Sequence, residues 1–325
     1  MNKQTYFITG GTGSFSKKFI YYLVKNKLAK KIVIFSRDEY KQMILKDLPF
    51  IKKNSSIFRF FIGDVRDKNR LDWALLEDID VVIHSAALKQ VPTTEYNPFE
   101  TVQTNILGSQ NLIEVCIKKN IKKVLNISTD KAVSPINLYG STKLTAEKLF
   151  VTANLFKGQK RSKFSVVRYG NVMGSRGSVL PVFLSQKKNN FFTITNKKMT
   201  RFNITLSYAA KFVSKCSSLM KGGEIFIPKS PSYRIMDLAK AVDKNKKIKI
   251  IGIRTGEKMH EELVSSIEFP YAIETKNLYI IYPLKKSKKM DVNELTYNSQ
   301  NNKDFLSIRE IQKLIEKNKN DFASI

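Results

Sequence analysis

Thr5-Tyr-Phe-Ile-Thr-Gly-Gly-Thr-Gly-Ser-Phe-Ser16 is the stretch that decides the fold of this 325-residue chain. Its first five residues form an apolar run, and a helix is expected over residues 14–26, so the glycines lie between a strand and a helix. Glycine is needed where the backbone turns sharply and where it must approach a pyrophosphate closely. The pattern Gly10-x-x-Gly13-x-x-Ser16 therefore predicts a dinucleotide whose phosphates lie at a helix N-terminus.

Five further apolar stretches continue the pattern. Strands are expected at residues 31–35, 57–62, 81–84, 123–128 and 164–168, with an amphipathic helix over 98–119 and another helix beginning near Tyr139. Strands that alternate with helices predict βαβ units, and strands that are apolar throughout are typical of a sheet covered on both faces. The expected fold class is α/β, a Rossmann-type doubly wound parallel sheet with a smaller C-terminal substrate-binding domain.

The pattern loosens after residue 170, and we place the division of the chain there. Residues 1–170 are expected to form the Rossmann domain, to which the chain returns around 203–228. Residues 171–325 are expected to form mainly the substrate-binding domain, with a polar linker at 285–303 and a C-terminal helix at 307–318.

The composition is that of a globular protein with an excess of positive charge. Apolar residues make up 42% of the chain, no apolar run is long enough to span a bilayer, and the first residues carry no signal-peptide pattern. Two cysteines without a paired motif favour a reduced, cytoplasmic protein, and two histidines without a ligand cluster predict no metal site. The net charge of +29 would suit a nucleic-acid partner, but the lysines are scattered and no aromatic residues interleave with them. We therefore expect neither nucleic-acid binding nor membrane insertion.

The residues after the second expected strand bear on the choice of cofactor. Asp38 would suit the ribose 2′-hydroxyl of NAD, whereas an arginine at position 37 would suit the 2′-phosphate of NADP. Arg37 with Ser36 and Lys41 can form a phosphate pocket, which favours NADP over NAD. The other residues expected to contact the cofactor are Gly10, Thr12, Gly13, Ser14, Phe15, Asp64, Val65, Ala86, Ala87, Lys89, Tyr139 and Lys143.

Tyr139 and Lys143 lie four residues apart, on one face of the expected helix. A free tyrosine has a pKa of about 10 and is a poor base at neutral pH. Because a cation beside the phenol favours the phenolate, we expect Lys143 to lower the pKa of Tyr139 while its ammonium binds the cofactor ribose. The pair predicts proton transfer coupled to hydride transfer.

The glycine loop, Ser128 and the Tyr139/Lys143 pair together resemble the extended short-chain dehydrogenase/reductase family, which acts largely on nucleotide sugars. The chain closely resembles the inverting UDP-N-acetylglucosamine 4,6-dehydratases of pseudaminic acid biosynthesis, and the resemblance thins only at about residues 285–300. The stretches that carry it include Phe35-Ser-Arg-Asp38, Gly63-Asp-Val-Arg-Asp67, Ala87-Leu-Lys-Gln-Val-Pro92, Ser128-Thr-Asp-Lys-Ala132, Pro135-Ile-Asn-Leu-Tyr-Gly140, Arg168-Tyr-Gly-Asn-Val172, Gly174-Ser-Arg-Gly-Ser178, Met199-Thr-Arg-Phe202 and Gly252-Ile-Arg254.

The resemblance implies an NADP cofactor, a UDP-sugar substrate and a homo-oligomer. It implies that Tyr139 takes the proton of the 4-hydroxyl, and that Asp130 and Lys131 are the acid and the base that remove water across C5 and C6. Ser128 and Thr129 are expected in the same catalytic group. The implied product is UDP-2-acetamido-2,6-dideoxy-β-L-arabino-hex-4-ulose.

The charged forms of Asp130 and Lys131 are the wrong forms for an acid and a base. The ionised pair and the neutral pair contain the same number of protons, so we expect the two side chains to titrate as one coupled unit. A dry site with the cationic Lys143 nearby should favour moving the proton from Lys131 to Asp130.

The same resemblance implies a set of substrate-binding residues. These are Lys89, Asn171, Val179, Thr195, Arg201, Arg254 and Glu257. Arginines suit a diphosphate, and a carboxylate suits a ribose or another hydroxyl. Gln90 and Thr255 stand where the resemblance predicts histidine and proline.

Two alternatives remain open at this point. A UDP-sugar 4-epimerase, or a 4,6-dehydratase that also epimerises the sugar, would share the fold and the Tyr139/Lys143 pair. A basic nucleic-acid-binding protein on a Rossmann shell would account for the charge, but not for the Asp130-Lys131 pair beside Tyr139.

Overall fold

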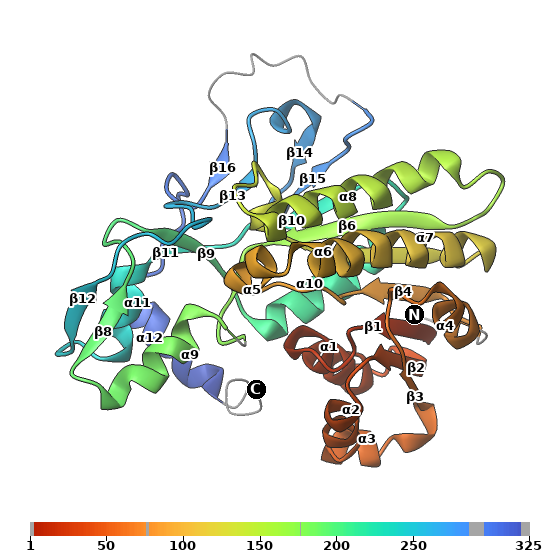
Figure 1. The fold of residues 1–325 in the computed structure, drawn as a ribbon, viewed down its shortest axis with the longest axis horizontal. Coiled ribbons are helices and arrows are strands. Elements are labelled where there is room, and N and C mark those ends of the chain that lie inside the picture. The colour runs from red at the N-terminus through yellow and green to blue at the C-terminus, as the bar shows by residue number, and fades with distance from the viewer. Residues whose placement is uncertain (1–2, 76–77, 176, 286–295, 320–325) are drawn as a thin grey trace.

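The computed structural model describes residues 3–75, 78–175, 177–285 and 296–319 of the chain. Within them, a nine-stranded sheet has the order β14-β15-β10-β6-β5-β4-β1-β2-β3 (Figure 1). Its strands are β1 (Gln4–Thr9), β2 (Ala29–Ser36), β3 (Phe58–Ile62), β4 (Val81–His84), β5 (Lys123–Thr129), β6 (Lys163–Tyr169), β10 (Ile225–Pro228), β14 (Ala272–Glu274) and β15 (Leu278–Ile281). The predicted parallel sheet is confirmed from β3 to β10, and β15 and β14 add an antiparallel edge.

Helices cover both faces of this sheet (Figure 1). They are α1 (Ser14–Lys25), α2 (Glu39–Lys46), α3 (Pro49–Lys52), α4 (Lys68–Ala74), α5 (Val91–Tyr96), α6 (Pro98–Val102), α7 (Gly108–Lys118), α8 (Leu138–Phe156) and α10 (Leu206–Leu219). Phe19 of α1 and Ile8 of β1 lie in one core, whereas Phe150 of α8 and Phe7 of β1 lie in the other. Because successive strand side chains point to opposite faces, an uninterrupted apolar strand serves both layers.

The single helix expected over residues 98–119 is interrupted. A π-turn at Gln103–Leu107 separates α6 from α7. Its buried Asn105 accepts a hydrogen bond from the Leu88 N–H at 2.8 Å and donates one to the Leu88 carbonyl at 2.9 Å. Such turns are frequent at functional sites, and this one holds the backbone that follows β4.

The smaller part of the molecule has a core of its own. A three-stranded sheet has the order β11-β9-β7, β8 pairs with β12, and β13 pairs with β16. These strands are β7 (Asn171–Val172), β8 (Phe191–Ile194), β9 (Thr200–Ile204), β11 (Ser232–Arg234), β12 (Lys247–Ile250), β13 (Glu262–Val264) and β16 (Tyr297–Asn298). The helices here are α9 (Val179–Ser185), α11 (Ile235–Val242) and α12 (Ile308–Lys317), and α12 begins with a capping box between Ser307 and Glu310.

The large sheet draws on the chain well beyond residue 170. Residues 206–228 return to it as α10 and β10, near the expected 203–228, and β14 and β15 add residues 272–281. A boundary at residue 170 therefore separates two stretches of sequence, but the large sheet contains strands from both of them.

The expected polar linker at 285–303 falls partly outside the described residues, which omit 286–295. The part that follows contains the two-residue strand β16 (Tyr297–Asn298). Tyr297 and Ser299 are buried, and the ring of Tyr297 packs against those of Phe202 and Tyr279. The polar composition of this stretch predicts a linker. The buried ring of Tyr297 and the backbone pairing with β13 instead fix it in place.

A buried ion network joins the two parts. Arg168 at the end of β6 is fully buried and donates to Glu147 of α8 at 3.0 and 2.6 Å. It also donates to Glu268 at 2.9 and 2.7 Å and to the Leu263 carbonyl at 2.9 Å. The guanidinium therefore fixes β13 against the helix that carries Tyr139.

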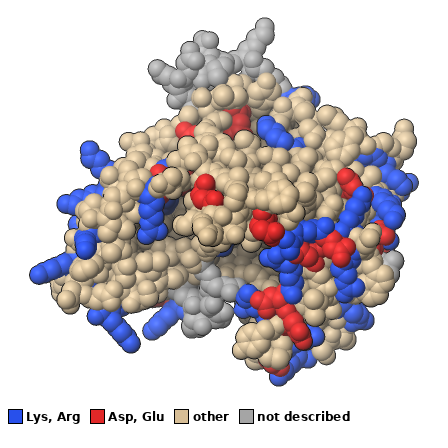
Figure 2. Space-filling view, viewed as in Figure 1, with Lys and Arg blue, Asp and Glu red and all other residues tan. Residues whose placement is uncertain are grey.

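None of the described helices is long and apolar enough to cross a membrane. Figure 2 shows lysine and arginine side chains mainly towards the rims of one face, with acidic side chains among them on the right. The described residues form ion pairs such as Arg66–Glu100 at 2.6 Å, and Lys118–Asp72 at 3.1 Å between α7 and α4.

Candidate active site

A cavity of about 650 Å³ lies at the carboxyl ends of the parallel strands. In an open α/β sheet this is the edge at which ligands bind. The predicted cofactor and catalytic residues come together around it: Gly10, Thr12, Gly13, Ser14, Phe15, Ser36, Arg37, Lys41, Asp64, Val65, Ala86, Ala87, Lys89, Ser128, Thr129, Asp130, Lys131, Tyr139 and Lys143. The cavity is therefore continuous from the glycine loop to the Tyr139/Lys143 pair.

The glycine loop has the geometry that a pyrophosphate requires. Gly10 has a φ of 62°, and a Cβ there would meet the Ala86 nitrogen and Cα at 2.9 Å. Gly13 is the N-cap of α1 and places no side chain over its first turn. The first N–H groups of this 12-residue helix adjoin the cavity, so the residues present fit the phosphates of a dinucleotide.

The far end of the cavity carries Arg37 and Lys41. The Asp38 carboxylate caps α2 by accepting from the Lys41 N–H at 2.9 Å, and it also pairs with the Lys41 ammonium. Arg37 is half exposed, and its Nη1 lies 3.3 Å from Oδ2 of Asp64. The acid that would suit a ribose hydroxyl is thus already engaged with its own helix, while the guanidinium faces the cavity.

Tyr139 lies in the first turn of α8, which begins at a cap from Asn137. The Asn137 Oδ1 accepts from the Gly140 N–H at 2.8 Å, and its Nδ2 donates to the Gly256 carbonyl at 2.8 Å. Burial raises the pKa of the Tyr139 phenol to about 12, against the lowering effects of Lys131 and of a hydrogen bond with Thr129. The expected lowering of the Tyr139 pKa is therefore not found, and the cation that acts on the phenol is Lys131.

Lys143 is a buried residue in the wall of the same cavity. Its Nζ donates to the Ile127 carbonyl at 2.7 Å, and burial lowers its pKa to about 8, against the charge of Glu147. Ser128 is also buried, and its Oγ has no hydrogen-bond partner among the described residues. An unpartnered hydroxyl at the cavity wall fits a polar ligand that completes its hydrogen bonding.

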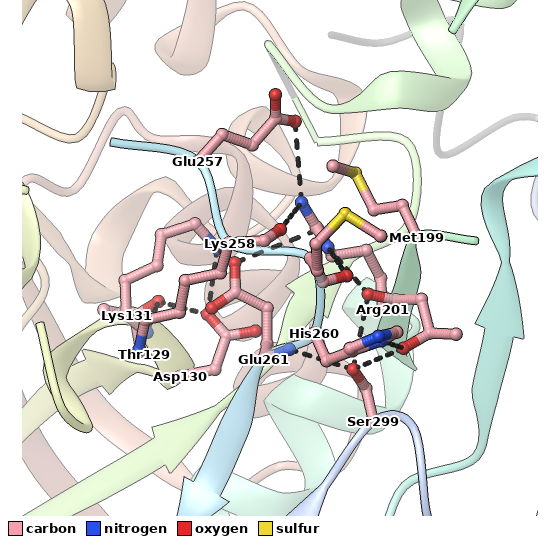
Figure 3. Close-up of polar contacts among 12 residues, drawn as sticks. Thr129, Asp130, Lys131, Met199, Arg201, Glu257, Lys258, His260, Glu261 and Ser299 are labelled. Atoms are coloured by element: carbon pink, nitrogen blue, oxygen red, sulfur yellow. Dashed lines mark hydrogen bonds and ion pairs between the residues drawn. The ribbon is translucent and has the colours of Figure 1, made fainter. Parts of the chain in front are cut away.

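The expected Asp130/Lys131 pair is a group of three in the structure. The Lys131 Nζ lies 3.0 Å from Oδ1 of Asp130 and 3.2 Å from Oε1 of Glu261 (Figure 3). Both carboxylates are buried, whereas the Lys131 side chain is 23% exposed and reaches the cavity. The predicted coupled pair therefore has a third member, because a residue 130 positions further along the chain supplies a second carboxylate.

The predicted substrate residues are less concentrated. Lys89 and Asn171 line the cavity. Val179 begins α9, Thr195 donates to the Met199 sulfur at 3.4 Å, and Arg254 is exposed; none of these three lines the cavity.

Arg201 and Glu257 also lie outside the cavity wall. Arg201 is buried and donates to the backbone carbonyls of Thr200, Lys258 and Met259 at 2.7, 2.9 and 3.1 Å. Its Nη2 also lies 3.5 Å from Oε1 of Glu257. Arg201 therefore holds the loop before β13 in this structure.

Glu261 is the site residue that the sequence interpretation missed. A glutamate in a charged stretch ordinarily lies on the surface, and nothing local to Glu257-Lys-Met-His-Glu261 shows that its last residue is buried. The sequence signal for burial of Glu261 was the short apolar strand that follows it and ends at Val264.

The sheet, the glycine loop and the Tyr139/Lys143 pair define a protein of the short-chain dehydrogenase/reductase class. More narrowly, the chain belongs to the polysaccharide biosynthesis protein family, which matches residues 6–283.

Individual relatives agree over nearly the full length. The chain is 46% identical to a UDP-N-acetylglucosamine 4,6-dehydratase (inverting) from Campylobacter jejuni, covering 97% of this chain and 98% of that protein. It is 41% identical to a UDP-glucose 4-epimerase from Rickettsia bellii, covering 96% and 95% of the two chains. The X-ray structure of Pen from Bacillus thuringiensis matches with a TM-score of 0.88 and 40% identity, covering 97% of this chain and 99% of that one.

Proposed function

We propose that this chain is a UDP-N-acetylglucosamine 4,6-dehydratase that inverts C5 and gives UDP-2-acetamido-2,6-dideoxy-β-L-arabino-hex-4-ulose. The observation that carries the proposal is the meeting of Asp130 and Lys131 with Tyr139 at one end of a cavity that begins at the glycine loop. Its support from relatives is the 46% identity to the Campylobacter jejuni enzyme of that name.

The side chains divide the chemistry between them. Tyr139 takes the proton of the 4-hydroxyl, Lys131 takes the C5 proton that the new C4 ketone acidifies, and Asp130 gives a proton to the departing 6-hydroxyl. A bound nicotinamide supplies the acceptor for the C4 hydride and the donor that returns it to C6. Lys143 would bind the cofactor ribose. Because the hydride taken from C4 returns to C6 and solvent supplies a proton to C5, water is removed with no net change of redox state.

We propose NADP as the cofactor. Arg37 and Lys41 offer cationic donors at the far end of the cavity, and Ser36 adds a hydroxyl. A 2′-phosphate is recognised best by such charge-assisted bonds. The Asp38 carboxylate, the type of group that usually binds the 2′-hydroxyl of NAD, accepts from the Lys41 N–H at the start of α2 and pairs with the Lys41 ammonium.

The decisive experiment is incubation with UDP-N-acetylglucosamine in deuterated water, followed by NMR of the product. Dehydration requires a C6 methyl signal, and inversion requires deuterium at C5 with the L-arabino configuration. Absence of the methyl signal from a folded, cofactor-loaded protein would refute the proposal.

A 4-epimerase is the second candidate, because the Rickettsia bellii relative has that name. It needs Tyr139 and Lys143 but no acid–base pair at C5 and C6, and its product retains the 6-hydroxyl. The buried Asp130 next to Lys131 favours dehydration, because an epimerase has no use for a proton donor at C6.

The proposal extends to the location, the assembly and the pathway of the protein. We propose a cytoplasmic homo-oligomer that supplies a pseudaminic acid type sugar, for example for flagellin glycosylation, and that binds neither nucleic acid nor membrane. The cofactor half would comprise residues 1–170 with the returning α10 and β10, and the rest of the chain would form mainly the substrate half.

A further inference from the structure

Glu261 is an enclosed carboxylate with one unsatisfied oxygen. The residue is 2% exposed, its Oε1 faces Lys131, and its Oε2 has no hydrogen-bond partner among the described residues. It does not line the cavity, so it reaches the reacting atoms only through Lys131. Burying a carboxylate is energetically costly unless it is paired with a cation.

The backbone around Glu261 is held from two sides. Its N–H donates to the Ser299 Oγ at 2.9 Å, and its carbonyl accepts from the Ser299 N–H at 2.8 Å. Arg168 holds the Leu263 carbonyl, and Lys258 donates to the Val133 carbonyl at 2.6 Å. The Glu261 side chain is therefore placed against Lys131 by structure that does not depend on a ligand.

The charges of the site can be counted. Lys131, Arg201 and Lys258 are its cations, and Asp130, Glu257 and Glu261 are its carboxylates (Figure 3). Glu257 pairs with Arg201, and Lys131 is shared between Asp130 and Glu261, so Asp130 has no cation to itself. Asp130 is also fully buried, and its Oδ2 has no hydrogen-bond partner among the described residues.

We propose that Glu261 is a positioning residue that holds Lys131 and exchanges a proton with it, so that Asp130 stays protonated while Lys131 becomes the base. The proposal rests on the proposed function for its place in the reaction. It replaces the two-residue unit with a relay in which Lys131 lies between two carboxylates.

The relay balances at each step. The Lys131 ammonium gives one proton to Glu261, and the free amine then takes the C5 proton. The C5–H electron pair forms the C5–C6 double bond as the C6–O bond breaks, and Asp130 protonates the leaving oxygen to give water. Lys131 then passes a proton to Asp130 and recovers the one held by Glu261, which restores the starting forms.

The electrostatics agree with the resting forms of this relay, in which Lys131 is charged, Glu261 is ionised and Asp130 is protonated. Burial, with Glu261 beside it, raises the pKa of Asp130 despite Lys131. Burial would raise the pKa of Glu261, but Lys131 and Arg201 lower it. Burial would likewise lower the pKa of Lys131, but Asp130 and Glu261 raise it.

Other titratable groups face this cluster from neighbouring elements. Tyr139 of α8 and Tyr233 of β11 interact with Lys131, and Lys258 and His260 of the loop interact with Glu261 and Arg201 respectively. The phenols have pKa values raised to about 12 by burial, and burial lowers the pKa of His260. Glu261 is therefore the carboxylate that sets the charge on Lys131 from outside its own segment.

The test compares Glu261→Gln with Glu261→Asp and with Glu262→Gln. The glutamine keeps the shape and removes the charge, and aspartate keeps the charge. Glu262 is the adjacent carboxylate, which accepts from Ser134 at 3.2 Å and is not in the cluster. We expect Glu261→Gln to lower kcat about 100-fold with KM within about twofold, since acid–base catalysis contributes about 10²–10⁴-fold. Glu261→Asp should recover at least about tenfold of that loss, and Glu262→Gln should behave as wild type.

Two further readouts separate a relay from a structural role. Removing the Glu261 charge lowers the pKa of Asp130, so the alkaline limb of the kcat profile should move to lower pH in Glu261→Gln but not in Glu262→Gln. The Asp130 carboxyl signal in protein labelled at aspartate, assigned with Asp130→Asn, should titrate at lower pH in Glu261→Gln without any substrate. An unchanged Asp130 titration would overturn the proposal whatever the substrate is. A wild type that yields no C6-methyl product would instead refute the proposed function and leave the carboxyl titration to judge Glu261.

Discussion

Replacing Arg168 with methionine tests how the site is held together. Arg168 is fully buried and makes five hydrogen bonds, two to Glu147, two to Glu268 and one to the Leu263 carbonyl. The Glu147 side chain is 1% exposed, so the change leaves a carboxylate in the interior without its ion-pair partner. Removing one partner of a buried pair costs about 3–5 kcal/mol, and we expect Arg168→Met to lower the free energy of unfolding by that amount.

The loss should depend on pH with a definite sign. Burial would raise the pKa of Glu268, but Arg168 holds it below its usual value. Such a group stabilises the fold above its unfolded pKa of about 4.3 and loses that contribution as the pH falls through the lower folded value. Without Arg168 the contribution is missing at neutral pH, so the difference between wild type and Arg168→Met should be largest at pH 7 and should shrink below about pH 4.3.

Urea unfolding at several pH values, followed by circular dichroism, measures this difference. Lys229→Met is the matched control, because Lys229 lies 2.6 Å from Glu274 in a pair whose side chains are 31% and 57% exposed. An exposed pair contributes less than about 1 kcal/mol. The reasoning is refuted if Arg168→Met is no more destabilising than Lys229→Met, or if its deficit is the same at every pH.

Three further changes address the cavity. Tyr139→Phe removes the base for the 4-hydroxyl and should lower kcat about 10²–10⁴-fold while the bound cofactor content stays at the wild-type level; a rate within threefold of wild type would remove Tyr139 from the mechanism. Arg37→Ser should weaken NADP binding about 10-fold or more, since a hydrogen bond to a charged group is worth about 1.5–3 kcal/mol, and should leave NAD binding unchanged; calorimetric titration with both cofactors checks this, and equal losses for the two would contradict a role at the 2′-phosphate. Gly10→Ala would place a Cβ 2.9 Å from the Ala86 backbone at a φ of 62°, so the purified variant should lack cofactor; full occupancy would show that the loop can move aside.

Local sequence patterns were sufficient to predict the parallel sheet and the side of the site that carries the glycine loop and the Tyr139/Lys143 pair. The apolar strands had to be buried on both faces, and the glycines had to lie between a strand and a helix, so the positions of Gly10, Tyr139 and Lys143 followed from residues near each of them. The carboxyl ends of parallel strands meet at one edge, which is why residues as distant as Arg37 and Ser128 could be assigned to the same cavity before the structure was known.

The partners of the charged groups could not be found in the same way. Periodicity says which face of an element is buried, but it does not say which distant segment covers that face. The ordered strand at Tyr297 and the buried Arg201 both depended on contacts between segments of the smaller part of the molecule.

By itself, the sequence determined a doubly wound sheet, a dinucleotide loop and an Asp130-Lys131 pair near Tyr139, because each is encoded by residues close together or by the common edge of parallel strands. Only the tertiary structure decided that Lys131 lies between two carboxylates, since Glu261 approaches it from β13 after a separation of 130 residues. The physical reason is that protonation depends on distance and burial, and both are set by the packing of the two parts around Arg168.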